Sequence, residues 1–271
     1  MDGSHGWDEV RAASLLFEDE AILALNKPPG ISVMGERHET DLVRMAGEAG
    51  ERLYPVHRID KVTSGLVLLA KEVRFHSGLT RQFNKQTVEK GYLVVTRASG
   101  PPDGSGQDGL PERGTIELPL SVGRKNRVRV AGRREDITRG ADRSPAGVRW
   151  SLPPGGEFAD KRSYPSTTTF VRLWADERNA LLAVRPVTGR RHQIRVHLAW
   201  IGHPIEGDPL FDRASADRGV STRLHSWRLA FDAAWAGDAR MRLVAPPPPG
   251  FFDPLRERLS GAAAEELLAR V

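Results

Sequence analysis

Short apolar runs separated by polar or glycine-rich turns recur along this chain of 271 residues. The run at 65–70 reads GLVLLA without polar alternation, which is typical of a strand buried on both faces. The run at 88–96 reads VEKGYLVVT, and a regular strand there places Lys90, Tyr92 and Val94 on one face. Further strands, two of them joined in a hairpin, are predicted at 15–26, 114–120, 167–176, 179–186, 223–231 and 240–246.

Helical periodicity is confined to a few segments of the chain. Residues 72–86 place Val73, Leu79 and Phe83 at roughly helical spacing, with polar residues between them. A short C-terminal helix is expected after the Asp-Pro pair at 253–254, because proline suits the first turn of a helix. Many strands and few helices predict an α+β fold with a large mixed, mostly antiparallel sheet, flanked by a few helices and long loops.

The segment TGRRHQIRVHLAWIG at 188–202 predicts one further helix. This helix is expected to begin near Arg190, with Thr188 as its cap. Arg191 and Arg195 are four residues apart, so we expect them on one helical face, one turn from each other.

The remaining segments lack a pattern that would build a core. Residues 1–14 are expected to form a flexible leader, and 15–271 a single domain. Two stretches rich in glycine, proline and charge, at about 99–113 and 136–163, are expected to be mobile loop excursions from that domain.

Composition narrows the class of protein. The formal net charge is +5, from 40 basic and 35 acidic residues, which makes a polyanionic partner plausible. The chain contains no cysteine, which excludes disulfides, thiolate metal sites and cysteine nucleophiles, and fits a reducing compartment. The first twenty residues do not resemble a signal peptide, and no apolar run is long enough for a membrane span. We therefore expect a soluble, cytoplasmic protein.

The stretch HRIDKVTSG at 57–65 carries the strongest candidate for chemistry. Its carboxylate, Asp60, lies in a turn between Arg58 and Lys61, directly before the buried strand. An aspartate in a turn is commonly a cap or an Asx-turn, and that interpretation stays open for Asp60 on this stretch alone. Ser64 lies outside any G-x-S-x-G elbow, so a serine nucleophile is not indicated.

Five segments, taken in order and spacing, resemble the RluA family of RNA pseudouridine synthases: NKPPGISV, HRIDKVTSG, EKGYLVV, VTGRRHQIRVHLAWIGHPIEGDPLF and LHSWRL. The resemblance runs from about residue 20 to 250, and it is to members without an N-terminal S4 domain. It implies that Asp60 is the catalytic aspartate and that Arg195 pairs with this carboxylate. It also implies that Tyr92 stacks under the target base and takes part in proton abstraction, and that Arg58 helps to fill the gap left by the extruded base. Members of the family work without a metal or cofactor, and their fold is a mixed, mostly antiparallel sheet in one catalytic domain.

Uridine isomerisation suits these residue types. The reaction breaks the C1′–N1 bond and forms a C1′–C5 bond, so it requires a nucleophile or base at the sugar and no redox group. An ionised Asp60 can serve in either way, and both ways stay open. The partner implied is ribosomal or transfer RNA, and the enzyme is expected to be a monomer. The residues expected to contact RNA are Arg58, Arg190, Arg191, Arg124, Lys125, Arg127 and Arg129.

Two other interpretations compete with an RNA-modifying enzyme. A metal site using His192 and His197 is disfavoured, because a spacing of five splays two helical side chains by about 140°. Local hydrogen bonding accounts better for these histidines. The second alternative is a catalytically silent RNA-binding or ribosome-assembly protein on the same fold, which would not need Asp60, Tyr92 and Arg195 together.

Overall fold

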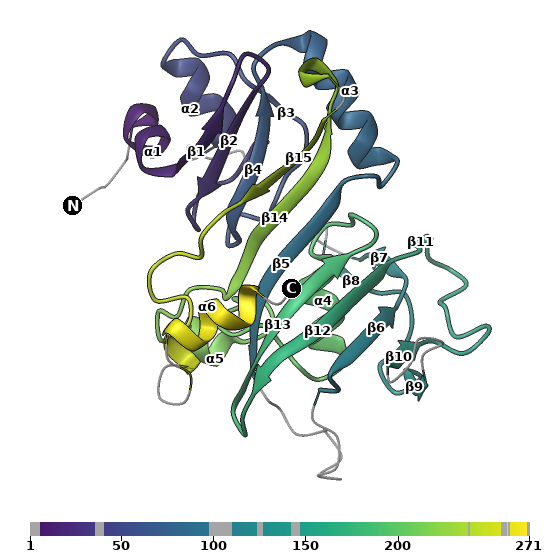
Figure 1. The fold of residues 1–271 in the computed structure, drawn as a ribbon. Coiled ribbons are helices and arrows are strands. Elements are labelled where there is room, and N and C mark those ends of the chain that lie inside the picture. Colours follow the sequence, from purple (N-terminus) through teal and green to yellow (C-terminus); the bar gives the residue numbers. More distant parts are fainter. Residues whose placement is uncertain are drawn as a thin grey trace. The chain divides into compact units, whose positions relative to one another are not determined.

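The computed structural model divides the chain into two compact units, and β5 (Glu89–Arg97) belongs partly to each (Figure 1). Unit 1 comprises Met1–Gly91 and His225–Pro248, and unit 2 comprises Tyr92–Leu224 and Pro249–Val271. The structure describes residues 6–35, 41–97, 110–123, 127–141, 147–237, 239–255, 259 and 261–269.

Unit 1 has the strand order β1-β2-β4-β14, with β3 also pairing with β4 and β15 with β14. Every pair is antiparallel except β4 with β14, two strands far apart in sequence that lie side by side in Figure 1. The strands are β1 (Leu15–Glu18), β2 (Ile22–Lys27), β3 (Tyr54–Pro55), β4 (Ser64–Ala70), β14 (Leu224–Ala233) and β15 (Ala239–Val244). The helices are α1 (Trp7–Ser14), α2 (Leu42–Glu48), α3 (Val73–Asn84) and the 3₁₀ turn η2 (Ala234–Ala236).

The centre of unit 1 is β4, whose seven residues are all buried. This confirms the expectation from its uninterrupted apolar run. Leu66 and Leu68 share a core cluster with Leu229 and Phe231 of β14. Helix α3 packs against the same sheet through Leu79, but Val73 is 62% exposed. The predicted apolar face is therefore wrong at Val73, because this first helical residue lies before the turns that contact the sheet.

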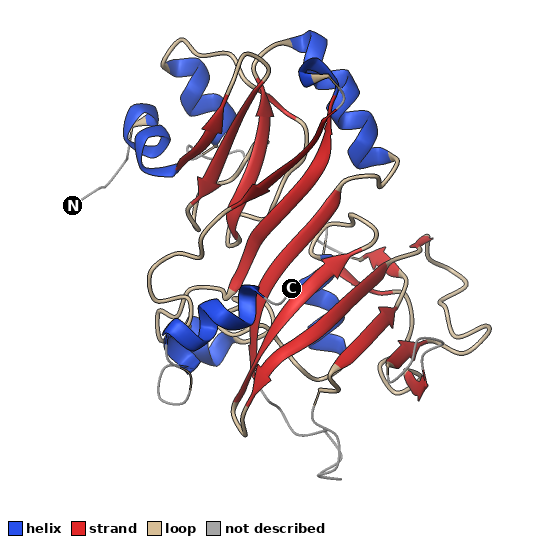
Figure 2. Ribbon diagram, viewed as in Figure 1, coloured by secondary structure: helices blue, strands red, loops and turns tan. Residues whose placement is uncertain are grey.

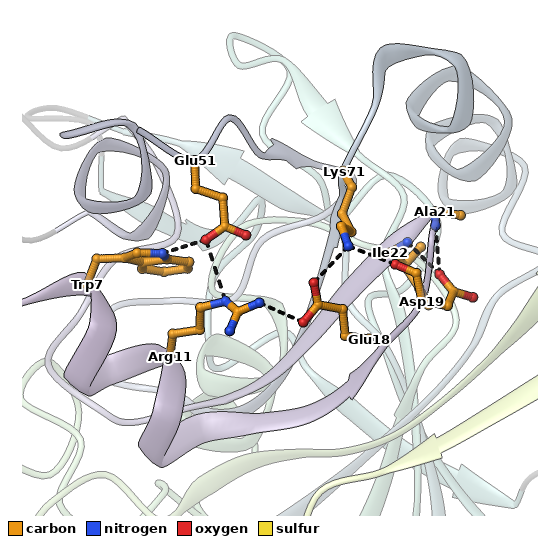
Figure 3. A network of polar contacts seen from close by, with 8 residues as sticks. All are labelled: Trp7, Arg11, Glu18, Asp19, Ala21, Ile22, Glu51 and Lys71. Atoms are coloured by element: carbon orange, nitrogen blue, oxygen red, sulfur yellow. Dashed lines mark hydrogen bonds and ion pairs between the residues drawn. The ribbon is translucent and has the colours of Figure 1, made fainter. Parts of the chain in front are cut away.

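The expected flexible leader is wrong for residues 7–14, which form α1. Trp7 and Val10, one turn apart, are both buried. The indole N–H of Trp7 donates to Glu51 at 2.6 Å, and Arg11 donates to Glu18 at 2.6 Å (Figure 3). Two large buried side chains on eight residues are too few to give a clear periodicity, so the helix depends on these long-range contacts.

Unit 2 has the strand order β5-β13-β12-β6-β10-β9, with a separate three-stranded sheet ordered β11-β7-β8. Only β6 and β10 pair in parallel among its described strand pairs. The strands are β6 (Arg113–Glu117), β7 (Leu120–Val122), β8 (Val128–Val130), β9 (Thr138–Ala141), β10 (Val148–Ser151), β11 (Ser163–Tyr164), β12 (Thr167–Ala175) and β13 (Asn179–Pro186). The helices are α4 (Gln193–Trp200), α5 (Arg213–Ala216), the 3₁₀ turn η3 (Asp253–Leu255) and α6 (Gly261–Ala269).

The predicted hairpin at 167–186 is confirmed as β12 and β13, and the large mixed sheet confirms the α+β fold class (Figure 2). The core of unit 2 gathers side chains from these strands and from α4. No helix among the described ranges is long and apolar enough to cross a bilayer.

The excursion expected at 136–163 is wrong as a description of pure loop. It contains β9 and β10, and β10 pairs in parallel with β6. Trp150 is buried against Phe170, and it is the one buried residue of β10. A four-residue strand with one core side chain has no alternation to detect, so distant pairing decides its structure. Of the other excursion, 99–109 lies outside the described residues, and Arg113 already begins β6.

Helix α4 begins at Gln193, three residues later than predicted. His192 precedes it with a left-handed backbone (φ 56°). Thr188 does not cap the helix; its hydroxyl donates to the side chain of Gln193 at 2.7 Å and accepts from the N–H of Thr167. The polar loop is thus closed by side chains before the helix starts, which the helical spacing alone does not indicate.

Candidate active site

Asp60 lies in a tight turn that leads into β4. Its backbone carbonyl accepts from the N–H of Thr63 at 3.0 Å, and the residue is half-buried. Gly65, just inside β4, fixes where this turn sits: with φ +106°, a Cβ there would lie 2.2 Å from the backbone carbonyl oxygen of Ser226. Only glycine allows this close approach to β14. The TSG part of the motif therefore anchors the turn that presents Asp60.

Lys27 was not singled out from the sequence, yet it is tied to the Asp60 turn. Its side chain is 0% exposed, and its ammonium group donates to the carbonyls of Pro28 at 2.8 Å and Lys61 at 3.3 Å. The N–H of Gly30 also donates to Lys61 O at 2.8 Å. The loop after β2 and the turn carrying Asp60 are thus joined through one lysine.

The charge of Lys27 is coupled to that of Asp60. Burial lowers the pKa of Lys27 to about 7, and the Asp60 carboxylate acts in the opposite direction. A buried ammonium group is costly unless it is paired or hydrogen-bonded. Here two carbonyls and one nearby carboxylate supply the compensation, so Lys27 helps to hold the turn that carries Asp60.

The motif resemblance makes Asp60 the catalytic carboxylate, and on that assignment Lys27→Met is expected to lower the rate of uridine isomerisation roughly tenfold, the size of one lost charge-assisted hydrogen bond. The affinity for RNA should stay unchanged, because Lys27 is buried. The matched control is Lys61→Met, which removes an exposed side chain from the same turn but keeps its carbonyl. Tritium release from [5-³H]uridine RNA measures turnover; equal rates for the two variants would contradict the role of Lys27.

His57, the first residue of the motif, is structural. Its Nε2 accepts from the backbone N–H of Leu68 at 3.0 Å, and its ring stacks on Phe83 with centroids 4.5 Å apart. Burial and the nearby charge of Lys90 lower the pKa of His57 to about 3. A neutral ring is required, since a protonated Nε2 cannot accept this bond.

Two further histidines are neutral core residues. His197 hydrogen-bonds Thr168 Oγ1 through Nδ1 and the carbonyl of Leu118 through Nε2, both at 2.9 Å. His225 bonds Ser64 Oγ at 2.9 Å. Burial lowers the pKa of each to about 4. Both ring nitrogens of His197 are thus engaged within the core, which supports local hydrogen bonding over metal ligation.

Because four histidines have a lowered pKa in the folded protein, we expect the free energy of unfolding to fall in mild acid. The folded-state pKa is about 3 for His57 and about 4 for His197, His203 and His225, all below the ordinary 6.5. The unfolded chain therefore binds protons first as the pH falls below 6.5, and each histidine lowers the unfolding free energy by up to about 1.4 kcal/mol per pH unit. Urea midpoints should fall from pH 7 to pH 5, and less steeply in His57→Gln. Equal midpoints at the two pH values would refute this.

Tyr92 and Arg195 belong to unit 2. Tyr92, on β5, is half-buried, packs against the core of the unit and pairs in register with Val184. Arg195, on α4, is 3% exposed and forms a bidentate ion pair with Asp208, Nε to Oδ2 at 2.7 Å and Nη2 to Oδ1 at 2.9 Å. Asp60 belongs to unit 1, so its pairing with Arg195 stays a prediction.

The predicted shared face of Arg191 and Arg195 is wrong. Arg191 is exposed and precedes the helix, whereas Arg195 is buried inside it. Asp208 was not assigned a role from the sequence. The available signal was an acidic residue 13 positions after Arg195, which lies on a helix that packs in the core, where a charged side chain needs a partner. Of the other residues predicted to contact RNA, Arg58, Arg190 and Arg127 are exposed and Arg129 is half-buried. Arg124 and Lys125 lie outside the described residues.

Comparison with known proteins gives one consistent result. The family profile for RNA pseudouridylate synthase matches residues 21–200. A ribosomal large subunit pseudouridine synthase C from Pasteurella multocida is 31% identical over 263 residues, covering 93% of this chain and 68% of that protein. A dual-specificity RNA pseudouridine synthase RluA from Vibrio parahaemolyticus is 34% identical over 223 residues, covering 80% and 76%. The solved structure of human RNA Pseudouridylate Synthase Domain Containing 4 has the same fold, with a TM-score of 0.66 and 22% identity over 92% of this chain and 95% of that chain.

Proposed function

The chain belongs to the RNA pseudouridylate synthase family, an isomerase family, and we propose that it converts uridines of ribosomal or transfer RNA to pseudouridine with Asp60 as the catalytic carboxylate. The observation that carries the assignment of Asp60 is its setting: a half-buried carboxylate on a turn pinned by Gly65 and Lys27. A carboxylate held in this way keeps one direction relative to the substrate, which is what positioned catalysis requires.

The reaction at the sugar follows from this carboxylate. Asp60 either attacks C1′ as a nucleophile or removes a sugar proton as a base, and the C1′–N1 bond then breaks. The freed uracil turns and bonds C1′ through C5. In the nucleophilic route the bond from Asp60 to C1′ breaks as the C5 bond forms, and in the base route Asp60 returns the sugar proton. The proton on C5 is then lost and N1 gains one, so that atoms balance without any external reagent. Loss of the C5 proton is the step that a tritium-release assay follows.

Tyr92 and Arg195 complete the proposed set. A target uridine must leave its stack, which costs a few kcal/mol. An aromatic platform such as Tyr92 recovers part of this cost, since base stacking is worth roughly 1–3 kcal/mol. Arg195 is proposed to keep the Asp60 carboxylate ionised and oriented. Its ion pair with Asp208 supports this, because it fixes the guanidinium on a rigid helix before any substrate binds.

The contacts with RNA are proposed for the exposed arginines. Arg190 and Arg191 precede α4, and Arg58 precedes Asp60 in its turn. Arginine suits this role because its planar fork matches phosphate oxygens. These contacts position the RNA and do not by themselves read its sequence.

The substrate is identified by comparing total RNA from cells with and without this protein. Pseudouridine is mapped at single-nucleotide resolution in ribosomal and transfer RNA. The proposal predicts that one or more sites lose pseudouridine in its absence and regain it with the wild-type chain, but not with Asp60→Asn. An unchanged map in both RNA classes would contradict the proposed function.

A further inference from the structure

Tyr164, the last residue of β11, supports two guanidinium groups. The Cζ atom of Arg162 lies 5.0 Å from the centroid of the Tyr164 ring, and that of Arg190 lies 5.4 Å from it. The ring is half-buried because Tyr164 pairs with Leu120, a core residue of β7. Both arginines are exposed. A ring fixed in the small sheet therefore holds two cations at the surface.

Phe158, six residues earlier, forms a second group of this kind, but the strand register places its partner Arg129 on the opposite face of the small sheet from Tyr164. Arg129 Cζ lies 5.7 Å and Lys161 Nζ 4.5 Å from the centroid of its ring. The backbone N–H of Phe158 donates to the carbonyl of Ala131 at 2.8 Å, which fixes this residue beside β8. The Nε of Arg129 is buried and has no hydrogen-bond partner among the described residues.

The positive charge of these groups is poorly compensated. Within the part of the chain that the structure describes, Arg129, Arg162 and Arg190 form no ion pair, and Lys161 reaches only Asp160, at 4.0 Å. Arg240, in contrast, is paired with carboxylates at 3.0 Å or less. Each cation–π contact is worth only about 0.5–1 kcal/mol at an exposed site. Its main effect is to hold a flexible side chain, which lowers the entropy lost when the cation binds an anion.

We propose that this arginine–aromatic surface of unit 2 binds the phosphate backbone of the RNA substrate. It consists of Arg162, Tyr164 and Arg190, and Tyr164 lies on β11, which is labelled in Figure 1. The proposal rests on the proposed function. An RNA strand fits better than an acidic protein, because guanidinium planes can also stack on unpaired bases while their edges pair with phosphate.

The charge of the surface is tested by the double variant Arg162→Ala/Arg190→Ala. Binding of a fluorescein-labelled single-stranded oligouridine is followed by anisotropy at several salt concentrations. The slope of log affinity against log salt should become shallower by about 1.4, because each lost phosphate contact on a single strand removes about 0.7. Arg178→Ala, an exposed arginine in the turn between β12 and β13, should keep the wild-type slope. A wild-type slope in the double variant would overturn the proposal.

The role of the ring is tested without changing the charge. Tyr164→Ala should weaken oligouridine binding severalfold, because Arg162 and Arg190 lose their support. Tyr164→Phe keeps the ring and should bind as the wild type does. Wild-type binding by Tyr164→Ala, or equal weakening in both variants, would overturn the role of the ring. Competition by poly-glutamate as effective as that by unlabelled oligouridine would show a preference for acidic protein and also overturn the proposal.

The experiments distinguish a failure of the proposed catalytic function from a failure of the proposed RNA-binding surface. Asp60→Asn should bind the oligouridine with wild-type affinity, and the Arg162→Ala/Arg190→Ala variant should still release tritium, but more slowly than the wild type when RNA is below saturation. No tritium release from wild-type protein, together with the predicted binding losses, would refute the proposed function and leave RNA binding standing. Normal release with unchanged binding in the variants would refute only the arginine–aromatic surface.

Discussion

Asp60→Asn is expected to lower the rate of tritium release from [5-³H]uridine RNA by roughly 10³-fold or more, within the range of a positioned catalytic group. Asparagine has nearly the same shape but can neither attack C1′ nor accept a proton. The turn around residue 60 should persist, because it depends on the backbone bond to Thr63 and on the tie from Lys27 to Lys61.

The matched control is Asp217→Asn, the same change at an exposed aspartate of unit 2. It should release tritium at the wild-type rate. Thermal unfolding of both variants should lie close to that of the wild type. If a folded Asp60→Asn protein releases tritium as fast as the wild type, the carboxylate is not the catalytic group.

Arg195→Met is expected to reduce both stability and activity. Removing the guanidinium leaves Asp208 buried without its ion-pair partner, and breaking such a pair typically costs about 3–5 kcal/mol. Turnover should fall on the order of 10²-fold, because the catalytic carboxylate also loses its proposed partner. Urea unfolding and tritium release measure the two effects.

A second variant separates these effects. Arg195→Met/Asp208→Asn removes both charges. In the wild type the N–H of Leu210 donates to Asp208 Oδ1 at 2.8 Å, and the side-chain oxygen of the asparagine keeps an acceptor for it. Replacing both members of a buried pair is often nearly neutral, so stability should largely return. Activity should stay low if Arg195 orients Asp60. Recovery of turnover together with stability would show that Arg195 has only a structural role.

The sequence predicted those strands whose own residues form a clear apolar pattern. The unbroken apolar run of β4, the apolar run of β5 and the hairpin of β12 and β13 each carry enough side chains to specify a strand. Among the elements it missed, α1 and β10 each bury one or two large side chains on a short segment. Their structure comes from partners distant in sequence, which no local pattern reports.

The candidate site shows the same division. Asp60, Tyr92 and Arg195 were predicted because they lie in recognisable motifs, and their roles stay predictions. Lys27 and Asp208 were missed, because charged residues near turns are ordinarily exposed and solvated. Their importance comes from burial: an ammonium group and a carboxylate without water each require a nearby partner. Burial of this kind is decided by the packing of whole elements.

The most direct test is the product itself. Purified protein is incubated with unmodified transcripts of ribosomal and transfer RNA, which are then digested to nucleosides and separated by chromatography with mass detection. The account predicts a nucleoside with the mass of uridine and the retention of pseudouridine, formed by the wild type and absent with Asp60→Asn. No such product from either RNA class, or equal amounts from both proteins, would contradict it.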